Sequence, residues 1–275
     1  MFKLNFTKIV GTGNDFILLD LRKQNKKLKL SAIAKQACNR KLGIGADGLL
    51  VLTKTPKATV KMQIFNADGS EAEMCGNGAR CVAYFVGKDN PGKKITIKTK
   101  AGIIASIVKN DTVKINLTEP RDIKLDINLK IGKYPLRVNF VNTGVPHIIV
   151  LCEKVEGIDV SHLGRLLRFH KKFAPRGTNV NFIEPVKLNE IKVRTYERGV
   201  EEETLACGTG SVASSIIYAL KLRASNLLKS NNAIINVDTA SGEVLRVSFD
   251  ILKNKIKNVW LEGNVKIVGK GEFYV

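Results

Sequence analysis

The sequence has few cysteines, few aromatic residues and no long apolar run. The 275 residues include 5 cysteines, and aromatic side chains make up 6% of the chain. No apolar stretch approaches the ~20 residues that span a bilayer, and the N-terminus lacks the apolar stretch of a signal peptide. The odd number of cysteines, with no C-x-x-C pair, indicates neither a disulfide scaffold nor a structural zinc site. We therefore expect a cytoplasmic chain with no membrane partner, in which any functional cysteine acts as a thiol.

Acidic residues are also scarce. The chain has 45 Lys plus Arg against 25 Asp plus Glu, a formal net charge of +20. Such a balance raises the possibility of a nucleic-acid partner, because basic side chains gain affinity by releasing counterions from phosphates. The basic clusters at residues 22–29, 165–176 and 253–257 are not interleaved with the aromatic side chains that stack on bases. We therefore interpret these clusters as solvated surface and predict no nucleic-acid binding.

Hydrophobic periodicity predicts a strand-rich α/β chain. Alternating or β-branched apolar runs are typical of strands, and they occur in both halves of the sequence. Two predicted helices open with a serine suited to capping, and two follow Gly-rich turns. The predicted strands are 3–10, 16–21, 49–53, 59–65, 94–100, 103–108, 112–117, 137–141, 147–151, 179–183, 190–196, 233–238, 244–249, 258–261 and 265–268. The predicted helices are 31–40, 78–86, 161–170 and 210–222.

Short motifs recur along the chain in the same order and at a nearly constant offset of 131 or 132 residues, which grows to 140 at the last match. The matches are Gly13 with Gly144, residues 45–47 with 177–179, residues 74–78 with 206–210, and residues 99–102 with 239–242. Ordered matches of this kind indicate two domains of one topology. We expect one domain at 1–118 plus 264–275, with the last strand returning to it, and the other at 119–263.

Each predicted domain carries one Cys-Gly-x-Gly motif, at Cys75 and at Cys207, just before a predicted helix. The unpaired N–H groups and the positive dipole end of a helix start favour an anion, so they lower a thiol pKa and bind a carboxylate. The glycines allow backbone amides to approach a ligand closely. A single copy would be better explained by a small residue packed at a helix start.

Two copies in related domains favour a two-base reaction. One thiolate could remove a proton from a carbon centre while the opposite thiol delivers a proton to the other face, which inverts the stereocentre. Helix-start amides would stabilise the developing negative charge. Such chemistry needs no cofactor or metal, and the chain has neither a complete Rossmann fingerprint nor a P-loop. A pyridoxal-phosphate lysine has no positive support in the sequence.

These motifs resemble the diaminopimelate epimerase family, whose members interconvert LL- and meso-diaminopimelate without a cofactor. The resemblance spans essentially the whole chain. It implies an isomerase of lysine and peptidoglycan precursor biosynthesis that forms a homodimer, with a small-molecule substrate bound in the cleft between two pseudo-symmetric domains, each a curved sheet around a central helix. The matching motifs are GTGNDF at 11–16, GIGADG at 43–48, FNADGS at 65–70 with CGNGARC at 75–81, and YERG at 196–199 with TLACGTG at 204–210.

The resemblance also implies roles for individual residues. Cys75 and Cys207 would be the acid/base pair, and His147 and Glu197 would tune the two thiols. Arg198 would pair with the distal carboxylate through its planar guanidinium. The implied substrate contacts are Asn14, Asn66, Gly76, Asn77, Asn179, Glu197, Arg198, Gly208 and Thr209.

Two departures from the family pattern bear on the substrate. Val145 stands where the family often has an asparagine, and Gly48 stands where some members carry a substrate-facing glutamine. Both changes concern the distal end of the substrate, so a racemase of another amino acid, such as histidine, remains an alternative. A redox switch that joins Cys75 to Cys207 in a reversible disulfide is a second alternative.

Overall fold

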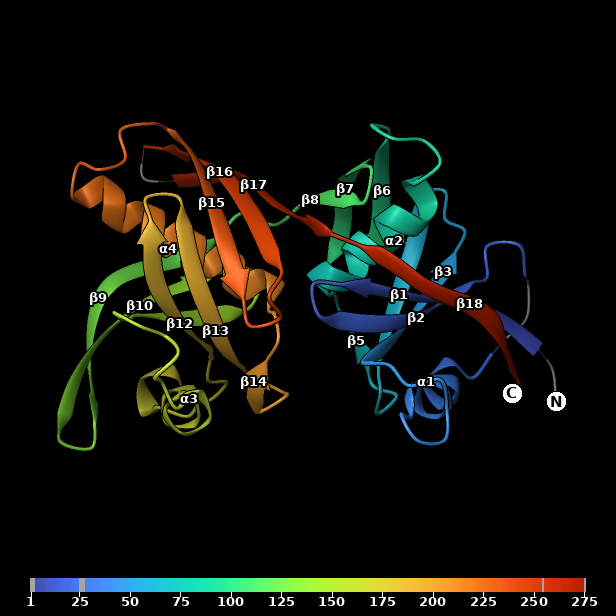
Figure 1. Cartoon of the computed structure of the whole chain (residues 1–275), viewed down its shortest axis with the longest axis horizontal. Helices are drawn as coiled ribbons and strands as arrows, with labels where there is room; N and C mark the ends of the chain where they lie inside the picture. The colour runs from blue at the N-terminus through green and yellow to red at the C-terminus, as the bar shows by residue number, and fades with distance from the viewer. Residues whose placement is uncertain (1–2, 25–27, 254, 275) are drawn as a thin grey trace. The chain divides into compact units, whose positions relative to one another are not determined.

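The computed structural model describes residues 3–24, 28–253 and 255–274, and the chain can be followed in Figure 1. It forms two compact units: unit 1 comprises Met1–Asn116 and Glu262–Val275, and unit 2 comprises Leu117–Leu261. Parts of the basic clusters at 22–29 and 253–257, and the first two residues of the N-terminus, lie outside the described residues.

Unit 1 is built on one mixed sheet. Strand β1 pairs antiparallel with β18 on one side and with β2 on the other. The sheet continues with a parallel β2–β3 pair, an antiparallel β3–β4 pair, a parallel β4–β6 pair and the antiparallel pairs β6–β7 and β7–β8. The strands are β1 (Lys3–Gly11), β2 (Asn14–Asp20), β3 (Gly48–Thr53), β4 (Val60–Asn66), β5 (Glu71–Ala72), β6 (Lys94–Thr99), β7 (Gly102–Lys109), β8 (Thr112–Asn116) and β18 (Lys266–Tyr274).

Unit 2 repeats this order of pairing. An antiparallel β9–β10–β11 run is followed by a parallel β11–β12 pair, an antiparallel β12–β13 pair, a parallel β13–β15 pair and an antiparallel β15–β16 pair. The repeat found in the sequence is therefore a repeat of strand connections. The strands are β9 (Arg121–Ile131), β10 (Tyr134–Asn142), β11 (Pro146–Leu151), β12 (Asn179–Lys187), β13 (Glu190–Glu197), β14 (Glu202–Thr204), β15 (Asn232–Thr239), β16 (Val244–Leu252) and β17 (Lys255–Asn264), whose residues from Glu262 onward belong to unit 1.

Each sheet curves around one central helix. Helix α2 (Gly76–Gly87) contacts β1 to β4 and β6 to β8, and α4 (Gly208–Ala224) contacts β10 to β13, β15 and β16. A helix enclosed on most sides needs small or apolar residues all round. Two of the buried hydroxyls of α4 are satisfied locally, because Ser211 and Ser215 donate to the carbonyls four residues earlier, at 3.0 and 2.8 Å. The predicted α/β fold is confirmed.

Two shorter helices cover the outer faces of the sheets. Helix α1 (Leu30–Cys38) packs on β3 and β4, and α3 (Val160–Arg168) packs on β12, β13 and β14. The prediction that serines cap these helices is wrong. Asp159 caps α3 by accepting from the His162 amide at 2.9 Å, because its carboxylate stands one residue before the first helical turn. Ser31 lies inside α1 and donates instead to the Gly69 carbonyl at 2.7 Å.

Three strands were not predicted from the sequence. Strands β5 and β14 have two and three residues, too few for a period of two to be recognised. Strand β9 is long but mostly exposed, and it carries two residues with positive φ, Asp122 and Asp126. Its register with β10 is interrupted twice, as expected for a bulged edge strand.

Neither a membrane-spanning helix nor a metal-binding cluster of His, Cys, Asp and Glu side chains is found within residues 3–24, 28–253 and 255–274.

Candidate active site

In unit 1 the site is built at the start of α2. Cys75 is the N-cap residue of this helix and has extended backbone angles, with φ −138° and ψ 125°. Its Sγ atom accepts from the backbone N–H of Gly78 at 3.5 Å. Gly76 and Asn77 form the first turn and are buried. The first Cys-Gly-x-Gly motif therefore lies at a helix start, where unpaired amides can bind an anion.

The side chain of Asn77 belongs to a directed chain of hydrogen bonds. The Arg80 Nη2 atom donates to Asn77 Oδ1 at 2.6 Å, and Asn77 Nδ2 donates to Asn14 Oδ1. Asn14 Nδ2 then donates to the Asp47 carboxylate at 3.1 Å. A guanidinium only donates and a carboxylate only accepts, so the two ends of the chain fix the orientation of both amides. Asn14 and Asn77, both predicted substrate contacts, are thus joined to each other.

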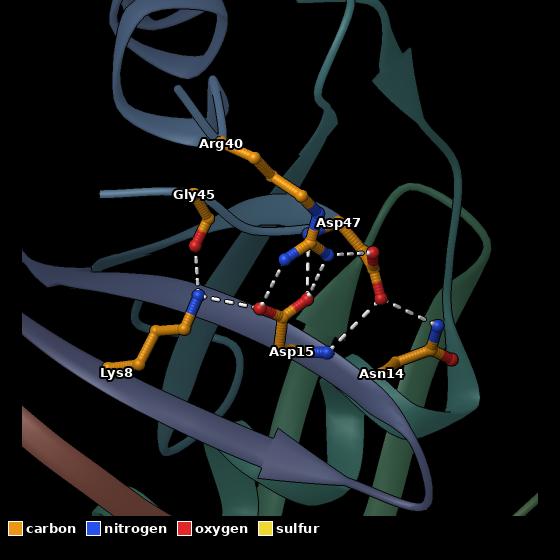
Figure 2. Close-up of polar contacts among 6 residues, drawn as sticks. All are labelled: Lys8, Asn14, Asp15, Arg40, Gly45 and Asp47. Carbon is orange, nitrogen blue, oxygen red and sulfur yellow. Dashed lines mark hydrogen bonds and ion pairs between the residues drawn. The ribbon is translucent and has the colours of Figure 1, made fainter. Parts of the chain in front are cut away.

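An ion-pair cluster lies next to Asn14, as Figure 2 shows. Asp15 accepts from Lys8 at 2.7 Å and from Arg40 at 2.8 Å, and Arg40 also reaches Asp47 at 2.7 Å. Burial raises the pKa of Asp15, but the hydrogen bonds and charges of Arg40 and Lys8 outweigh it and lower that pKa to about 2. Sequence reasoning assigned these residues no role, although Asp15 and Asp47 lie inside two of the motifs that carried the family resemblance.

Asn66 does not join this chain in the described contacts. It is the exposed last residue of β4, and its side-chain amide donates to Ser70 Oγ at 3.0 Å across a tight turn. Its predicted contact with the substrate stays a prediction.

In unit 2 the site is built at the start of α4. Cys207 is the buried N-cap residue, with φ −117° and ψ 111°, and Gly208 begins the helix. The Cys207 Sγ atom lies 3.5 Å from Thr209 Oγ1. A Cβ atom at Gly210 would lie 2.3 Å from Asn181 Oδ1 and 3.3 Å from the Cys207 sulfur. The final glycine of this motif is therefore required by packing around the thiol.

His147 lies at the start of β11 and is completely buried. Its Nε2 atom is 3.1 Å from Thr209 Oγ1, and its Nδ1 atom is 3.1 Å from Asn181 Nδ2. Burial, together with the positive charge of Arg198, lowers the pKa of His147 to about 3. The ring is therefore neutral near pH 7, and within unit 2 it is connected to Cys207 through Thr209.

Arg198 and Asn179 are joined at the end of β13. Asn179 Oδ1 accepts from the backbone N–H of Arg198 at 2.8 Å, and Asn179 Nδ2 donates to the Pro146 carbonyl at 3.0 Å. Asn179 is only 4% exposed, so it positions the backbone that carries Arg198. Sequence reasoning had expected it to contact the substrate, and that role stays a prediction.

Two further guanidinium groups, those of Arg168 and Arg176, lie near Arg198. Burial, followed by the charges of Arg168 and Arg176, lowers the pKa of Arg198. Arg168 is paired with Glu201 at 2.9 Å, whereas the Arg198 guanidinium donates to the Arg176 backbone carbonyl at 3.5 Å. No ion pair between Arg198 and a carboxylate is found among the described residues, and the charge of Glu201 only partly opposes the lowering of its pKa. The cluster therefore has an excess of positive charge and can accept an anionic group of a ligand.

Glu197 is the last residue of β13 and directly precedes Arg198. Burial raises the pKa of its carboxyl group, and the hydrogen bond from the Thr204 hydroxyl at 3.1 Å opposes that rise. A carboxyl group with a raised pKa takes up a proton closer to neutral pH than an exposed glutamate does. Its expected effect on a thiol stays a prediction.

The remaining cysteines lie in different surroundings. Burial raises the pKa of Cys38 and of Cys152 to about 11, so both are neutral thiols near pH 7. Cys81 is fully buried inside α2. These positions support the interpretation of all three as packing residues.

The departure at Gly48 has a steric reason. A Cβ atom there would lie 2.8 Å from the Phe65 carbonyl oxygen on the neighbouring strand. A glutamine at this position would need the backbone of β3 or β4 to move. Val145, in contrast, is half-buried in the turn before β11, and nothing in the structure explains it.

Solved structures with the same fold include racemases and isomerases of several kinds. A phenazine biosynthesis protein of the PhzF family from Bacillus anthracis superimposes with a TM-score of 0.77 at 16% identity, covering 100% of both chains. A probable proline racemase from Agrobacterium radiobacter K84 superimposes with a TM-score of 0.72 at 14% identity, covering 99% of this chain and 93% of its own. At such identities the likeness establishes the fold alone.

Sequence comparison is more specific. The family model described as diaminopimelate epimerase matches residues 6–123 and 139–267. The diaminopimelate epimerase of Aquifex aeolicus is 43% identical over 98% of this chain and 97% of its own length. That of Methanocella arvoryzae is 42% identical over 100% and 98%. The chain belongs to the diaminopimelate epimerase family, a family of isomerases.

Proposed function

We propose that the chain interconverts LL- and meso-diaminopimelate by a cofactor-independent two-base reaction in which Cys75 and Cys207 exchange protons with the α-carbon. The observation that carries this proposal is that both cysteines are N-cap residues of the central helix of their unit. Membership of the family supports the substrate, because the relatives at 43% and 42% identity bear the name of this enzyme.

The proposed reaction moves one proton onto one sulfur and another off the second. The thiolate of one cysteine takes the α-proton, and its electron pair stays on carbon and the adjacent carboxylate. The thiol of the other cysteine then gives its proton to the opposite face and becomes the thiolate, which leaves the pair ready for the reverse direction. The amides of Gly76, Asn77, Gly208 and Thr209 would hold the carboxylate and stabilise its developing charge.

Recognition of the distal carboxylate is assigned to Arg198. Diaminopimelate carries a second carboxylate and ammonium group far from the reacting carbon, and the guanidinium cluster of Arg198, Arg168 and Arg176 has the charge and the donor geometry to bind the carboxylate. Glu197 would tune the thiols, while Asn14, Asn66 and Asn179 would contact or position the substrate.

An exchange assay in deuterated water tests this proposal. Product formed early from LL-diaminopimelate should carry deuterium at the inverted α-carbon while unreacted substrate keeps its proton, because the delivering thiol has equilibrated with solvent. The same assay should be run with a panel of amino acids. Exchange with histidine and none with diaminopimelate would favour the alternative racemase, and no exchange with any substrate by reduced protein would favour a redox switch.

We also propose that units 1 and 2 act as the two catalytic domains of a cytoplasmic homodimer in lysine and peptidoglycan precursor biosynthesis. Sedimentation analysis of the intact chain tests the dimer. A monomer at concentrations where the enzyme is active would contradict it.

A further inference from the structure

We infer that Asn181, which the proposed reaction does not use, is a positioning residue that holds the proton of His147 on Nε2 and thereby directs the Thr209 hydroxyl toward the sulfur of Cys207. The catalytic consequence rests on the proposed function, whereas the geometry does not. All four residues belong to unit 2.

The orientation of the Asn181 amide is fixed from two sides. Its Nδ2 atom donates to the Ile148 backbone carbonyl at 3.0 Å, and a carbonyl can only accept. Its Oδ1 atom accepts from the Thr195 hydroxyl at 3.0 Å. Asn181 is fully buried, so reversal of the amide would leave polar atoms unsatisfied at a cost of ~1–3 kcal/mol each. The Nδ2 atom therefore faces His147.

This orientation selects one tautomer of His147. The second N–H of Asn181 Nδ2 points at His147 Nδ1, 3.1 Å away, so Nδ1 must be the acceptor. A neutral ring then carries its only proton on Nε2, which donates to Thr209 Oγ1 at 3.1 Å. The lowered pKa of His147, caused by burial and by Arg198, agrees with a neutral ring.

The tautomer in turn directs the Thr209 hydroxyl. An oxygen that accepts from His147 has its own proton left to donate, and the Cys207 sulfur lies 3.5 Å away. A hydrogen bond to the charged form of a group favours that form, so the hydroxyl stabilises the thiolate of Cys207. With the other tautomer, the hydroxyl would donate to the bare Nε2 atom instead, and the thiolate would lose this donor.

We call the series of hydrogen bonds from Asn181 through His147 and Thr209 to Cys207 the relay. Apolar side chains stand in unit 1 where Asn181 stands in unit 2. At Gly78, the third residue of α2, an added Cβ atom would meet Leu50 Cδ2 at 3.0 Å and Ile64 Cδ1 at 3.4 Å. At Gly210, the third residue of α4, it would meet Asn181 Oδ1 at 2.3 Å. The relay therefore distinguishes Cys207 from Cys75, whose sulfur accepts from a backbone N–H. We expect the two thiols to respond differently when the relay is broken.

The first test is a direct observation of the tautomer in the wild-type chain. Long-range ¹H–¹⁵N correlation spectra of protein labelled in its 3 histidines separate Nδ1 from Nε2. The signal of His147 is the one that survives in the His162→Gln/His170→Gln chain. We expect a neutral ring with the proton on Nε2 throughout pH 6 to 8. A proton on Nδ1, or on both nitrogens, would overturn the inference.

The second test measures the alkylation rate of each cysteine by mass spectrometry of its peptide, near neutral pH and without substrate. Asn181→Leu and Thr209→Val should each slow alkylation of Cys207 about tenfold and leave Cys75 within about twofold, since a hydrogen bond to a charged group is lost. Thr209→Ser keeps the hydroxyl and should restore most of the rate. Only Asn181→Leu should also change the His147 tautomer.

Asn139→Leu is the matched control. Asn139 is another buried asparagine of unit 2, on β10, and it bonds to the Asp126 amide and the Ile149 carbonyl outside the relay. Its variant should leave the Cys207 rate and the tautomer unchanged. An equal slowing in this control, or unchanged Cys207 alkylation in Thr209→Val, would refute the relay. If Asn181→Leu does not fold, the wild-type spectrum and the alkylation rates of Thr209→Val and Thr209→Ser still test the relay.

These measurements separate the relay from the proposed function, because neither requires turnover. In the epimerase assay, Asn181→Leu should lower kcat and leave KM nearly unchanged, since Asn181 acts on the thiol and does not bind the substrate. A chain with the expected tautomer and alkylation pattern but no epimerase activity would refute the function alone.

Discussion

Removal of the Asp15 carboxylate should show how much the ion-pair cluster next to Asn14 contributes to the free energy of unfolding. In Asp15→Asn the side chain keeps its shape, and its oxygen can still accept from the Asp47 amide, which lies 3.0 Å from it. The negative charge that Lys8 and Arg40 contact is lost. The Asp15 side chain is only 18% exposed, so solvent screens these contacts less than those of a surface pair.

The magnitude follows from the pKa of Asp15, which falls from 3.8 to about 2 in the folded chain. At ~1.4 kcal/mol for each pH unit, the shift corresponds to about 2 kcal/mol of stability at pH 7. Because the folded pKa lies below the unfolded value, the stabilisation is complete above the unfolded pKa and is lost as the pH falls through the folded one. At pH 3 about half of it should remain.

Urea unfolding followed by circular dichroism at pH 7 and pH 3 checks both numbers. Asp15→Asn should be about 2 kcal/mol less stable than the wild type at pH 7 and about 1 kcal/mol less stable at pH 3. Asp89→Asn is the control, because Asp89 is 77% exposed and paired only with its neighbour Lys88 among the described contacts. Two results would refute the reasoning. One is a difference in unfolding free energy between Asp15→Asn and the wild type that is the same at both pH values. The other is a loss of stability in Asp89→Asn equal to that in Asp15→Asn.

Three further predictions concern the candidate site. Arg198→Lys keeps the charge but loses the planar fork, so KM for diaminopimelate should rise more than kcat falls, and unchanged kinetics would remove Arg198 from the site. Cys75→Ala and Cys207→Ala should each abolish epimerisation in folded protein, because acid and base act as one unit; near-native turnover by either variant would contradict the two-thiol reaction. Gly210→Ala should lower the urea midpoint more than Gly78→Ala. The methyl group added at Gly210 would lie 2.3 Å from the fixed amide oxygen of Asn181, whereas the one added at Gly78 would lie 3.0 Å from a methyl group of Leu50. Equal midpoints would contradict that packing.

Local features of the chain were predictable from the sequence. Strand and helix periods depend on residues a few positions apart, so the strand-rich α/β class and the helix starts at both Cys-Gly-x-Gly motifs could be recognised directly. The repeated motifs at a nearly constant offset also anticipated two units with the same order of strand pairing. Helix capping was less predictable, because a shift of one or two residues in the start of the first turn decides which side chain caps the helix. Ser31 lies inside the first turn of α1, whereas Asp159 stands just before the first turn of α3 and caps it.

The polar connections of the site were decided by tertiary structure. Asn181 meets His147 because β11 and β12 pair in parallel, with Ile149 opposite Asn181. His147 meets Thr209 because the sheet packs around α4. The cluster of Asp15 and Asp47 depends in the same way on the parallel pairing of β2 with β3. His147 is 34 residues from Asn181 and 62 residues from Thr209 in the sequence, and no local pattern encodes strand register. The sequence by itself therefore determined where the two thiols stand on their helices, and only the packed sheets decided which side chains surround them.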